Sequence, residues 1–330
     1  MILPGNSPAA IDEAAQALQR GALLGLPTET VYGLAADADN DAAVAAIFAA
    51  KGRPSNHPLI VHVADAAAIT RFAKEVPVFA QQLIDAFWPG PLTLILPRRA
   101  DMVAAATGGQ DSVGLRCPSH PVAHSLLQAC TQLQPPVWGV AAPSANRFGR
   151  VSPTTAAHVQ SEFGEELLVL DGGECAVGIE STIVDCTRGV PVLLRPGAVT
   201  RADIEGACGI RPLSKEELPA HTPRASGTLL AHYAPDAKVR LMDAQQLQAG
   251  LDLLGADAAH LGVYARSPLQ VPPPVVLRRM PDDPAAAARE LFAMLREFDA
   301  AGVRLLWIET PPATPAWEGV RDRLQRAAAA

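Results

Sequence analysis

The chain has 330 residues, of which 49% are hydrophobic and 18% are charged, and its formal net charge is -7. This composition is typical of a globular protein, and the length favours two domains. The negative balance excludes a general basic field that would hold nucleic acid without specificity, so any contact with RNA must be local.

The cysteines and the N-terminus indicate a reducing compartment. Five cysteines are scattered along the chain without a CxxC pair, which argues against a disulfide framework and against a zinc ribbon. The N-terminus lacks the basic start and long apolar core of a signal peptide, and no apolar run approaches the roughly 18 residues of a membrane helix. We therefore expect a soluble, cytoplasmic protein.

The N-terminal part predicts a helix and then a strand that ends in a group of hydroxyls. Ser7 followed by Pro8 is typical of an N-cap and a first helical residue, and it predicts a helix over residues 8–20. A strand predicted over residues 22–26 leads into Thr28-Glu29-Thr30-Val31-Tyr32. Hydroxyls at a strand end are typical of ligand sites in open α/β sheets, although Thr and Tyr are also ordinary strand residues.

A cationic turn follows the next predicted helix, which begins with Asp41 as its N-cap and ends at Lys51. Lys51 and Arg53 are separated by one residue. Lys51 carries a compact point charge and Arg53 a planar guanidinium that can bind two oxygens at once, a pairing suited to phosphate or carboxylate oxygens. The alternative is a solvated helix C-terminus, where the helix dipole favours cations. A strand predicted over residues 59–63 places His62 near its end.

Basic residues recur at the ends of predicted strands. A strand over residues 112–116 ends in Arg116, and a hairpin of strands over residues 181–186 and 190–194 is followed by Arg195. Scattered surface charge explains one such position easily but all of them poorly. Further helices are predicted over residues 65–74 and 77–87 and from about 120, and further strands over 92–96, 137–142 and 167–170.

A polar loop follows the strand predicted over residues 137–142. It contains Pro143-Ser144-Ala145-Asn146, and Ser152-Pro153 is predicted to start the next helix. Free backbone N–H groups at a helix start bind anions well, although a capped turn would explain the loop equally.

The C-terminal part predicts a linker and a small α/β domain. Residues 208–235 show little periodicity and end in His232-Tyr233-Ala234-Pro235. Strands predicted over 238–242, 259–263, 275–277 and 303–308 alternate with helices over 243–254, 283–299 and 316–329. We therefore expect a first domain over 1–207, a linker over 208–235 and a second domain over 236–330. Neither half contains a GxGxxG or Walker sequence.

Seven blocks of the sequence resemble the L-threonylcarbamoyladenylate synthases, whose catalytic domain is of the YrdC type. The blocks cover residues 27–34, 51–62, 88–93, 113–116, 143–146, 178–185 and 194–197, in the family's order. The His-Tyr-Ala-Pro signature and the second domain resemble the long, two-domain form. The resemblance implies a twisted open mixed sheet with flanking helices, followed by a smaller Rossmann-like α/β domain.

The resemblance also implies a reaction. ATP, L-threonine and bicarbonate would give threonylcarbamoyl-AMP and pyrophosphate, with Mg²⁺ accompanying ATP. The product would pass to a tRNA-modifying transferase complex for the N6-threonylcarbamoyl modification of adenosine 37. At most weak or local RNA binding is expected, and no membrane partner.

Site residues follow from position in the matching blocks, and the resemblance implies catalytic roles for Lys51 and Arg53. The implied ATP-binding residues are Lys51, Arg53, His57, Ser112, Ser144, Asn146, Ser152, Arg195 and Tyr233. The implied threonine-binding residues are Thr30, His62, Arg116, Ala142 and Ser181. Tyr233 would fold over the mouth of the site as part of a linker lid. No dedicated metal ligand is implied beyond Glu29 as a candidate, and a metal held by ATP phosphates and water would also fit.

The sequence departs from the family pattern at two places. His57 stands where the family often has Asn, and the linker has Ala225-Ser226-Gly227-Thr228 in place of Ser-Pro-Gly-Met. The contacts of His57 with a nucleotide and the stiffness of the lid therefore need separate tests.

Three rival hypotheses compete with the synthase. The first is a hydrogenase-maturation carbamoyltransferase, a related class with CxxC zinc motifs, which this chain lacks. The second is an RNA-binding module that uses Lys51, Arg53, Arg147 and Arg150 to hold duplex RNA by its phosphates. The third is a cysteine hydrolase built on Cys117, with Arg116 lowering the pKa of the thiol.

Overall fold

The computed structural model describes residues 1–217, 223–254 and 258–330. The chain divides into two compact units. Unit 1 contains residues 1–148 and 152–228, and unit 2 contains residues 149–151 and 229–330. Residues 218–222 of the predicted linker lie outside the described residues.

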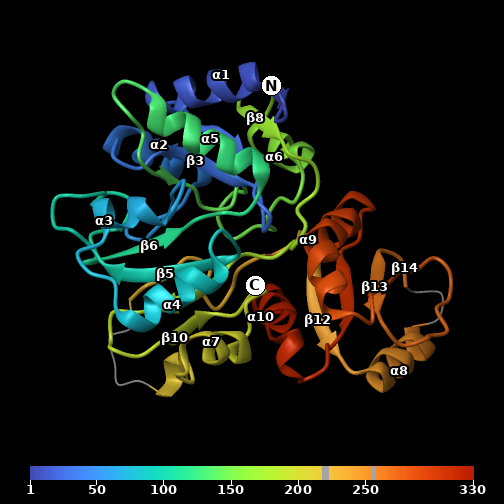
Figure 1. The fold of residues 1–330 in the computed structure, drawn as a ribbon. Helices are drawn as coiled ribbons and strands as arrows, with labels where there is room; N and C mark the ends of the chain where they lie inside the picture. The colour runs from blue at the N-terminus through green and yellow to red at the C-terminus, as the bar shows by residue number, and fades with distance from the viewer. Residues whose placement is uncertain (218–222, 255–257) are drawn as a thin grey trace. The chain divides into compact units, whose positions relative to one another are not determined.

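Unit 1 is built on an eleven-stranded mixed sheet (Figure 1). The strands in spatial order are β1 (Ile2–Pro4), β8 (Leu168–Asp171), β2 (Leu24–Leu26), β3 (Gly33–Asp37), β7 (Val140–Ala141), β4 (Ile60–His62), β6 (Ser112–Arg116), β5 (Leu92–Pro97), β9 (Thr182–Asp185), β10 (Val192–Arg195) and β11 (Leu213–Ser214). β6 pairs with β4 in parallel and with β5 in antiparallel orientation, so the predicted mixed sheet is confirmed.

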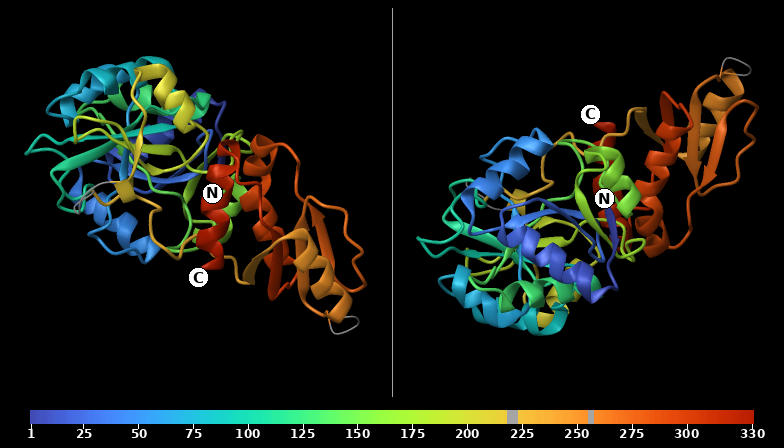
Figure 2. Two further views of the ribbon diagram at one scale, coloured as in Figure 1. Left: turned by 90° about the horizontal axis from the view of Figure 1, so that it is seen from below. Right: turned by 90° about the horizontal axis from the view of Figure 1, so that it is seen from above.

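The helices of unit 1 pack on both faces of this sheet (Figures 1 and 2). On one face, α1 (Pro8–Gln19) and α5 (Pro121–Gln132) lie side by side over part of the sheet. On the other face lie α2 (Asp41–Lys51), η1 (Ala66–Ala68), α3 (Ile69–Phe72), α4 (Val78–Phe87), α6 (Ala156–Phe163) and α7 (Arg201–Cys208). Side chains alternate between the faces: in β3, Leu34 belongs to the core under α2 and Ala35 to the core under α1.

Of three predicted helix starts, that of α1 is confirmed, and those of α2 and α6 were wrong. Ser7 accepts a hydrogen bond from the backbone of α1, as predicted. The N-cap of α2 is Asn40 rather than Asp41, because the Asn40 side chain accepts from the third residue after it. The helix α6 begins after Thr155, and the Thr155 hydroxyl accepts a hydrogen bond from the backbone N–H of His158. Ser152 therefore does not start this helix, and the helix start predicted at Ser152 was wrong.

The face of the sheet that carries α1 and α5 is only partly covered by these two helices. The chain segment that follows residue 222 covers another part of it. Ile95, Ile183 and Leu194 form an apolar patch on this face, and Ala225 packs against it. Because side chains of a strand alternate between its faces, residues two positions from members of this patch lie on the same face. This rule places Thr93 and Ser181 there, and it also places His62, because Ile60 packs against the patch. Ser112 and Arg116 lie on this face as well, since each is adjacent in β6 to a residue, Val113 or Leu115, whose side chain lies in the opposite core.

Unit 2 is a smaller parallel sheet with helices on both faces (Figures 1 and 2). Its strands in spatial order are β12 (Lys238–Met242), β15 (Leu305–Glu309), β13 (Leu261–Ala265) and β14 (Val276–Arg279). α8 (Ala244–Leu254) lies across the sheet from α9 (Pro284–Ala300) and from α10 (Glu318–Ala328), which follows η4 (Pro315–Trp317). The predicted smaller α/β domain is confirmed.

Glycines allow these helices to approach the sheet of unit 2. A Cβ added to Gly250 of α8 would lie 2.8 Å from the Trp307 ring, and one added to Gly262 of β13 would lie 2.7 Å from the Phe298 ring of α9. Among the helices of the described residues, none is long and apolar enough to cross a bilayer.

Candidate active site

Strand register brings His62 and Arg116 together. β4 and β6 are parallel, and His62 is the register partner of Arg116 at their carboxyl ends. β7 pairs with β4 in the opposite direction, and the Ala142 N–H that follows it donates to the Ile60 carbonyl at 3.0 Å. His62 and Arg116 are each only 3% exposed. His62 and Arg116 thus lie side by side, and Ala142 lies next to Ile60, two residues before His62 on the same strand.

Arg116 is held from three sides by buried or backbone groups. Its Nη1 donates to the Thr30 hydroxyl at 2.8 Å, and its Nε donates to the Gly90 carbonyl at 3.3 Å. Its Nη2 forms an ion pair with Glu29 Oε1 at 2.6 Å. Glu29, which the sequence suggested as a metal ligand, is therefore the partner of an arginine.

Burial and pairing set the charges of this cluster. Burial alone would raise the pKa of Glu29, but the charge of Arg116 and its hydrogen bond bring that pKa below its usual value. Burial, and then the charge of Arg116, lower the pKa of His62 to about 3. At neutral pH the cluster thus contains one cation, one anion and a neutral imidazole.

The cationic turn is buried rather than solvated. Gly52 closes α2 in the left-handed conformation (φ 63°), and Lys51 is 3% exposed and Arg53 8% exposed. Lys51 Nζ donates to the Ser144 carbonyl at 2.5 Å and to the Asn146 carbonyl. The interpretation of this turn as a solvated helix end is excluded, because the ammonium points into the protein.

Arg53 extends the cationic turn toward an aromatic ring and the linker segment. Its Nη2 donates to the Pro58 carbonyl at 3.0 Å and to the Ser226 hydroxyl at 3.4 Å. Its guanidinium lies 5.8 Å from the centre of the Phe148 ring, and the His57 ring packs edge-on against the same ring at 5.5 Å.

Positive charges are crowded around this turn. Burial, and then repulsion from Arg53, lower the pKa of Lys51 well below its usual value. Burial, followed by the charges of Arg53 and Arg224, also lowers the pKa of His57. Because like charges raise each other's free energy, an anion bound among them would be stabilised.

Arg195 joins the site through Ser181. Its Nε donates to the Ser181 carbonyl at 3.0 Å and its Nη2 to the Ser181 hydroxyl at 3.1 Å, while Thr93 Oγ1 lies 2.8 Å from the same hydroxyl. Its Nη1 donates to the Ser226 carbonyl at 2.9 Å. Ser226 therefore contacts both Arg53 and Arg195.

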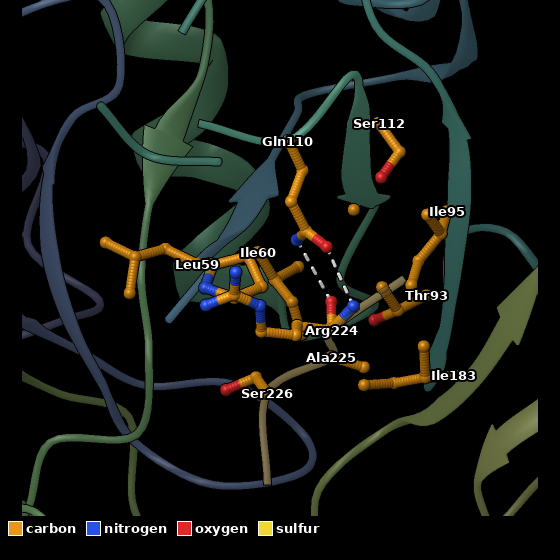
Figure 3. A pocket seen from close by; sticks show the side chains of 12 residues that line it. Leu59, Ile60, Thr93, Ile95, Gln110, Ser112, Ile183, Arg224, Ala225 and Ser226 are labelled. Atoms are coloured by element: carbon orange, nitrogen blue, oxygen red, sulfur yellow. Dashed lines mark hydrogen bonds between the residues drawn. The ribbon is translucent and has the colours of Figure 1, made fainter. Parts of the chain in front are cut away.

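Ser112 lines a pocket that the segment around Arg224 largely fills (Figure 3). The Arg224 N–H donates to Gln110 Oε1 at 2.7 Å, and Gln110 Nε2 donates back to the Arg224 carbonyl at 3.2 Å. About 20 Å³ of free space remains between these residues. That space has room for about one water molecule.

The remaining predicted ATP-binding residues of unit 1 lie around Lys51. The backbone of Ser144 forms an isolated antiparallel β-bridge with that of Gly33, and the Asn146 N–H donates to the Ser144 carbonyl at 3.0 Å. The hydroxyl of the buried Ser152 donates to Glu180, whose charge acts on Lys51. The site therefore contains a second buried carboxylate near the cationic turn.

Tyr233 belongs to unit 2, where it is buried. Its ring lies 5.4 Å from the Phe292 ring, and the Arg323 guanidinium lies 5.5 Å from its centre. Its φ of 62° is in the left-handed region. Its contact with ATP stays a prediction.

The cysteine-hydrolase and RNA-binding hypotheses lose support. Cys117 is buried, and burial, with Asp65 and Glu29 nearby, raises the pKa of its thiol to about 11, so the thiol is a poor nucleophile at neutral pH. In unit 2, Arg150 pairs with Asp236 at 2.6 Å, so part of its charge is offset. In unit 1, the Arg147 guanidinium lies 6.0 Å from the Phe163 ring.

Sequence reasoning missed several groups that contact the predicted residues, namely Thr93, Phe148, Glu180 and Ser226. It also missed Gln110 and Arg224, which line the same pocket as Ser112. Glu180 could have been predicted as a site residue from the sequence, because it directly precedes Ser181 in a matching block. Ser226 and Gln110 could not have been predicted in this way, since their contacts depend on how the chain folds back over the sheet.

The fold and the site define a two-domain α/β protein whose mixed sheet has a buried group of basic side chains on one face. A family model for Sua5, YciO and YrdC proteins, described as telomere recombination, matches residues 16–197. A second model, described as the threonylcarbamoyl-AMP synthase C-terminal domain, matches residues 199–329. The chain belongs to the Sua5 family of threonylcarbamoyl-AMP synthases.

Two threonylcarbamoyl-AMP synthases and one solved structure are similar to this chain over nearly its whole length. The threonylcarbamoyl-AMP synthase of Pyrococcus abyssi is 36% identical over 324 residues, covering 95% of this chain and 92% of its own. That of Bacillus subtilis is 36% identical over 340 residues, covering 99% and 94%. The crystal structure of P. abyssi Sua5 complexed with L-threonine has a TM-score of 0.88 at 35% identity and covers 96% and 94%. The chain is accordingly an enzyme of the nucleotidyltransferase type, and the resemblance is confirmed.

Proposed function

We propose that this chain makes threonylcarbamoyl-AMP and pyrophosphate from ATP, L-threonine and bicarbonate. In the cytoplasm, the product would pass to a tRNA-modifying transferase complex for the modification of adenosine 37. The observation that most supports the two main substrates is the pairing of two sites on one face of unit 1. One contains the crowded cations Lys51 and Arg53, and the other contains Arg116 paired with Glu29.

The crowded cations suit the triphosphate. Lys51 and Arg53 would act on the charge that develops on the leaving pyrophosphate, where fixed cations in a dry site stabilise a transition state. The other residues proposed on the ATP side are His57, Ser112, Ser144, Asn146, Ser152 and Arg195, to which the resemblance adds Tyr233.

The Arg116 cluster suits a small zwitterion. Arg116 would pair with the threonine carboxylate, and Thr30, Ala142 and Ser181 would surround the amino acid beside the neutral imidazole of His62. The threonine amine attacks the carbon of bicarbonate, and a bicarbonate oxygen leaves as water with a proton from the amine. With CO2, the amine adds to the carbon and releases a proton, and either route gives a carbamate. A carbamate oxygen then attacks the α-phosphorus while pyrophosphate leaves, so the protein needs to orient the reactants and exclude water.

Mg²⁺ is proposed to arrive with ATP. Within residues 1–217, 223–254 and 258–330, no group of three or more His, Cys, Asp or Glu side chains is placed to hold a metal. Mg²⁺ is commonly bound by substrate phosphates with one or two carboxylates, and Glu180 is a carboxylate near Lys51. The residues present thus fit an ion bound mainly by ATP, which would offset phosphate charge.

The proposal is tested by pyrophosphate release from ATP with Mg²⁺, leaving out threonine and bicarbonate in turn. We expect release to require both, with serine a poor replacement, and mass spectrometry to detect threonylcarbamoyl-AMP. Release without threonine, or no release under any condition, would contradict the proposal and leave a shared fold only.

A further inference from the structure

We propose that Glu29 is a positioning residue for threonine binding, acting through Arg116. This inference rests on the proposed function, in which Arg116 holds the substrate carboxylate. It assigns a role to a buried side chain that the sequence suggested only as a metal ligand.

Arg116 keeps N–H donors that a ligand could use. A guanidinium has five N–H donors, and three partners face it among the residues that the structure describes: Thr30, Glu29 and Gly90. Two N–H groups therefore remain, and each Nη atom has only one of the three partners. A carboxylate that binds both Nη atoms needs one N–H from each. Glu29 thus fixes the plane of the guanidinium without using up its donors.

The segment that contains Glu29 is itself held rigidly. The Thr28 hydroxyl donates to the Val31 carbonyl at 2.6 Å and accepts from the Thr30 and Val31 N–H groups, both at 3.3 Å. The Glu29 carbonyl accepts from the Val177 N–H at 2.7 Å. A hydroxyl that closes a turn in this way restricts the backbone on both sides of Glu29. The carboxylate is therefore presented to Arg116 from a fixed position.

Glu29 also sets the charge of the subsite. The Arg116 and Glu29 charges cancel, and burial and the charge of Arg116 keep His62 neutral. A zwitterionic amino acid adds no net charge to such a subsite, whereas a triphosphate would add several negative charges. Glu29 thus favours the small zwitterion at Arg116 and disfavours the nucleotide phosphates there.

The test measures L-threonine binding by calorimetry and the steady-state kinetics of pyrophosphate release for the unchanged protein, Glu29→Gln and Glu29→Asp. Glu29→Gln keeps the size but removes the charge, and it should weaken threonine binding by about tenfold, the size of coupling seen between buried neighbours. The KM for threonine should rise by a similar factor, while kcat and the Kd for ATP change by less than about twofold. Glu29→Asp keeps the charge and should recover most of the threonine affinity, whether or not Glu29→Gln folds well. Glu13→Gln, an exposed glutamate on α1, is the matched control and should bind threonine normally.

The outcomes separate this inference from the proposed function. If Glu29→Gln binds threonine as tightly as the unchanged protein, or more tightly, Glu29 does not position Arg116 and the inference fails, although threonine-dependent pyrophosphate release still supports the synthase. If Glu29→Asp loses as much threonine affinity as Glu29→Gln, or loses affinity for ATP equally, the role is structural and the inference also fails. If the unchanged protein neither binds threonine nor needs it for pyrophosphate release, the proposed function fails and the inference fails with it.

Discussion

The Arg116 cluster and the cationic turn are both buried on unit 1, but they balance charge differently. Arg116 has an anionic partner, Glu29, at 2.6 Å. At the turn, Lys51 donates to backbone carbonyls, and burial and then the neighbouring Arg53 lower its pKa, while Glu180 acts in the opposite direction. One cluster is therefore neutral and held rigidly, whereas the other contains two cations that repel each other, with no carboxylate in direct contact with Lys51 among the residues that the structure describes.

This difference matches two kinds of ligand. A neutral cluster with free N–H donors suits an amino acid, which is a zwitterion near neutral pH. Crowded cations suit a polyanion, because a bound anion relieves their repulsion. Each site should therefore bind the ligand of the other site poorly.

The largest expected effect on catalysis comes from removing the ammonium group of Lys51. Lys51→Met keeps the length of the side chain but removes the charge, and it should lower kcat/KM for pyrophosphate release on the order of 100-fold, because one fixed donor in a buried site is lost. Lys74→Met, on the exposed surface, is the control. Unchanged kcat/KM in Lys51→Met would remove the turn from the mechanism.

Arg53 should contribute less than Lys51 but still measurably. Arg53→Ala is expected to cost more than ~10-fold in rate through lost charge stabilisation. The same change removes the contacts with Phe148 and Ser226, so thermal unfolding should be recorded alongside the kinetics. Arg20→Ala, an exposed arginine, serves for comparison. Near-normal turnover in Arg53→Ala would argue that Lys51 alone acts on the phosphates.

The Arg116 cluster should be insensitive to mild acid. The pKa of His62 lies at about 3 and that of Glu29 lies below its usual value, so neither group gains a proton as the pH falls from 7.5 to about 5. The Kd for L-threonine should therefore vary by less than about twofold over this range, measured by calorimetry in buffers of different ionisation heat. A tenfold change centred near pH 6.5 would mean that a histidine in the site titrates.

The smallest expected effect concerns the segment that covers the sheet. Gln110→Ala removes the pair of hydrogen bonds with the Arg224 backbone and should lower the free energy of unfolding by about 1 kcal/mol. Urea unfolding measures this, with the exposed Gln132→Ala as control. No loss of stability would indicate that the segment is not held there in solution.

The fold was largely predictable because most elements have strong local signals. The strands β6 and β12 match their predicted ranges, and α1 is confirmed with its Ser7 cap. β1 and β11 were not predicted, because such short edge strands are set by their neighbours in the sheet rather than by their own pattern. The α6 start was wrong because Ser152 resembles a cap, whereas its hydroxyl bonds to Glu180 in the folded chain.

The site was predictable as a set of residues but not as a geometry. The repeated cations at strand ends pointed to anion binding, and the resemblance supplied the positions. The pairing of Glu29 with Arg116 and the placement of Ser226 between two arginines depend on contacts between distant parts of the chain. Periodicity and spacing describe one segment at a time and cannot supply such contacts.

The measurement that tests this account most directly is a crossed titration of ATP and L-threonine against Arg53→Ala and Arg116→Lys. The two-site account predicts that Arg53→Ala weakens ATP binding by about tenfold or more while the Kd for threonine changes by less than about twofold. It predicts the reverse for Arg116→Lys, since lysine cannot form the paired hydrogen bonds of a guanidinium. If both variants weaken the same ligand, or each weakens both equally, the division of the face into an anion site and an amino-acid site is contradicted.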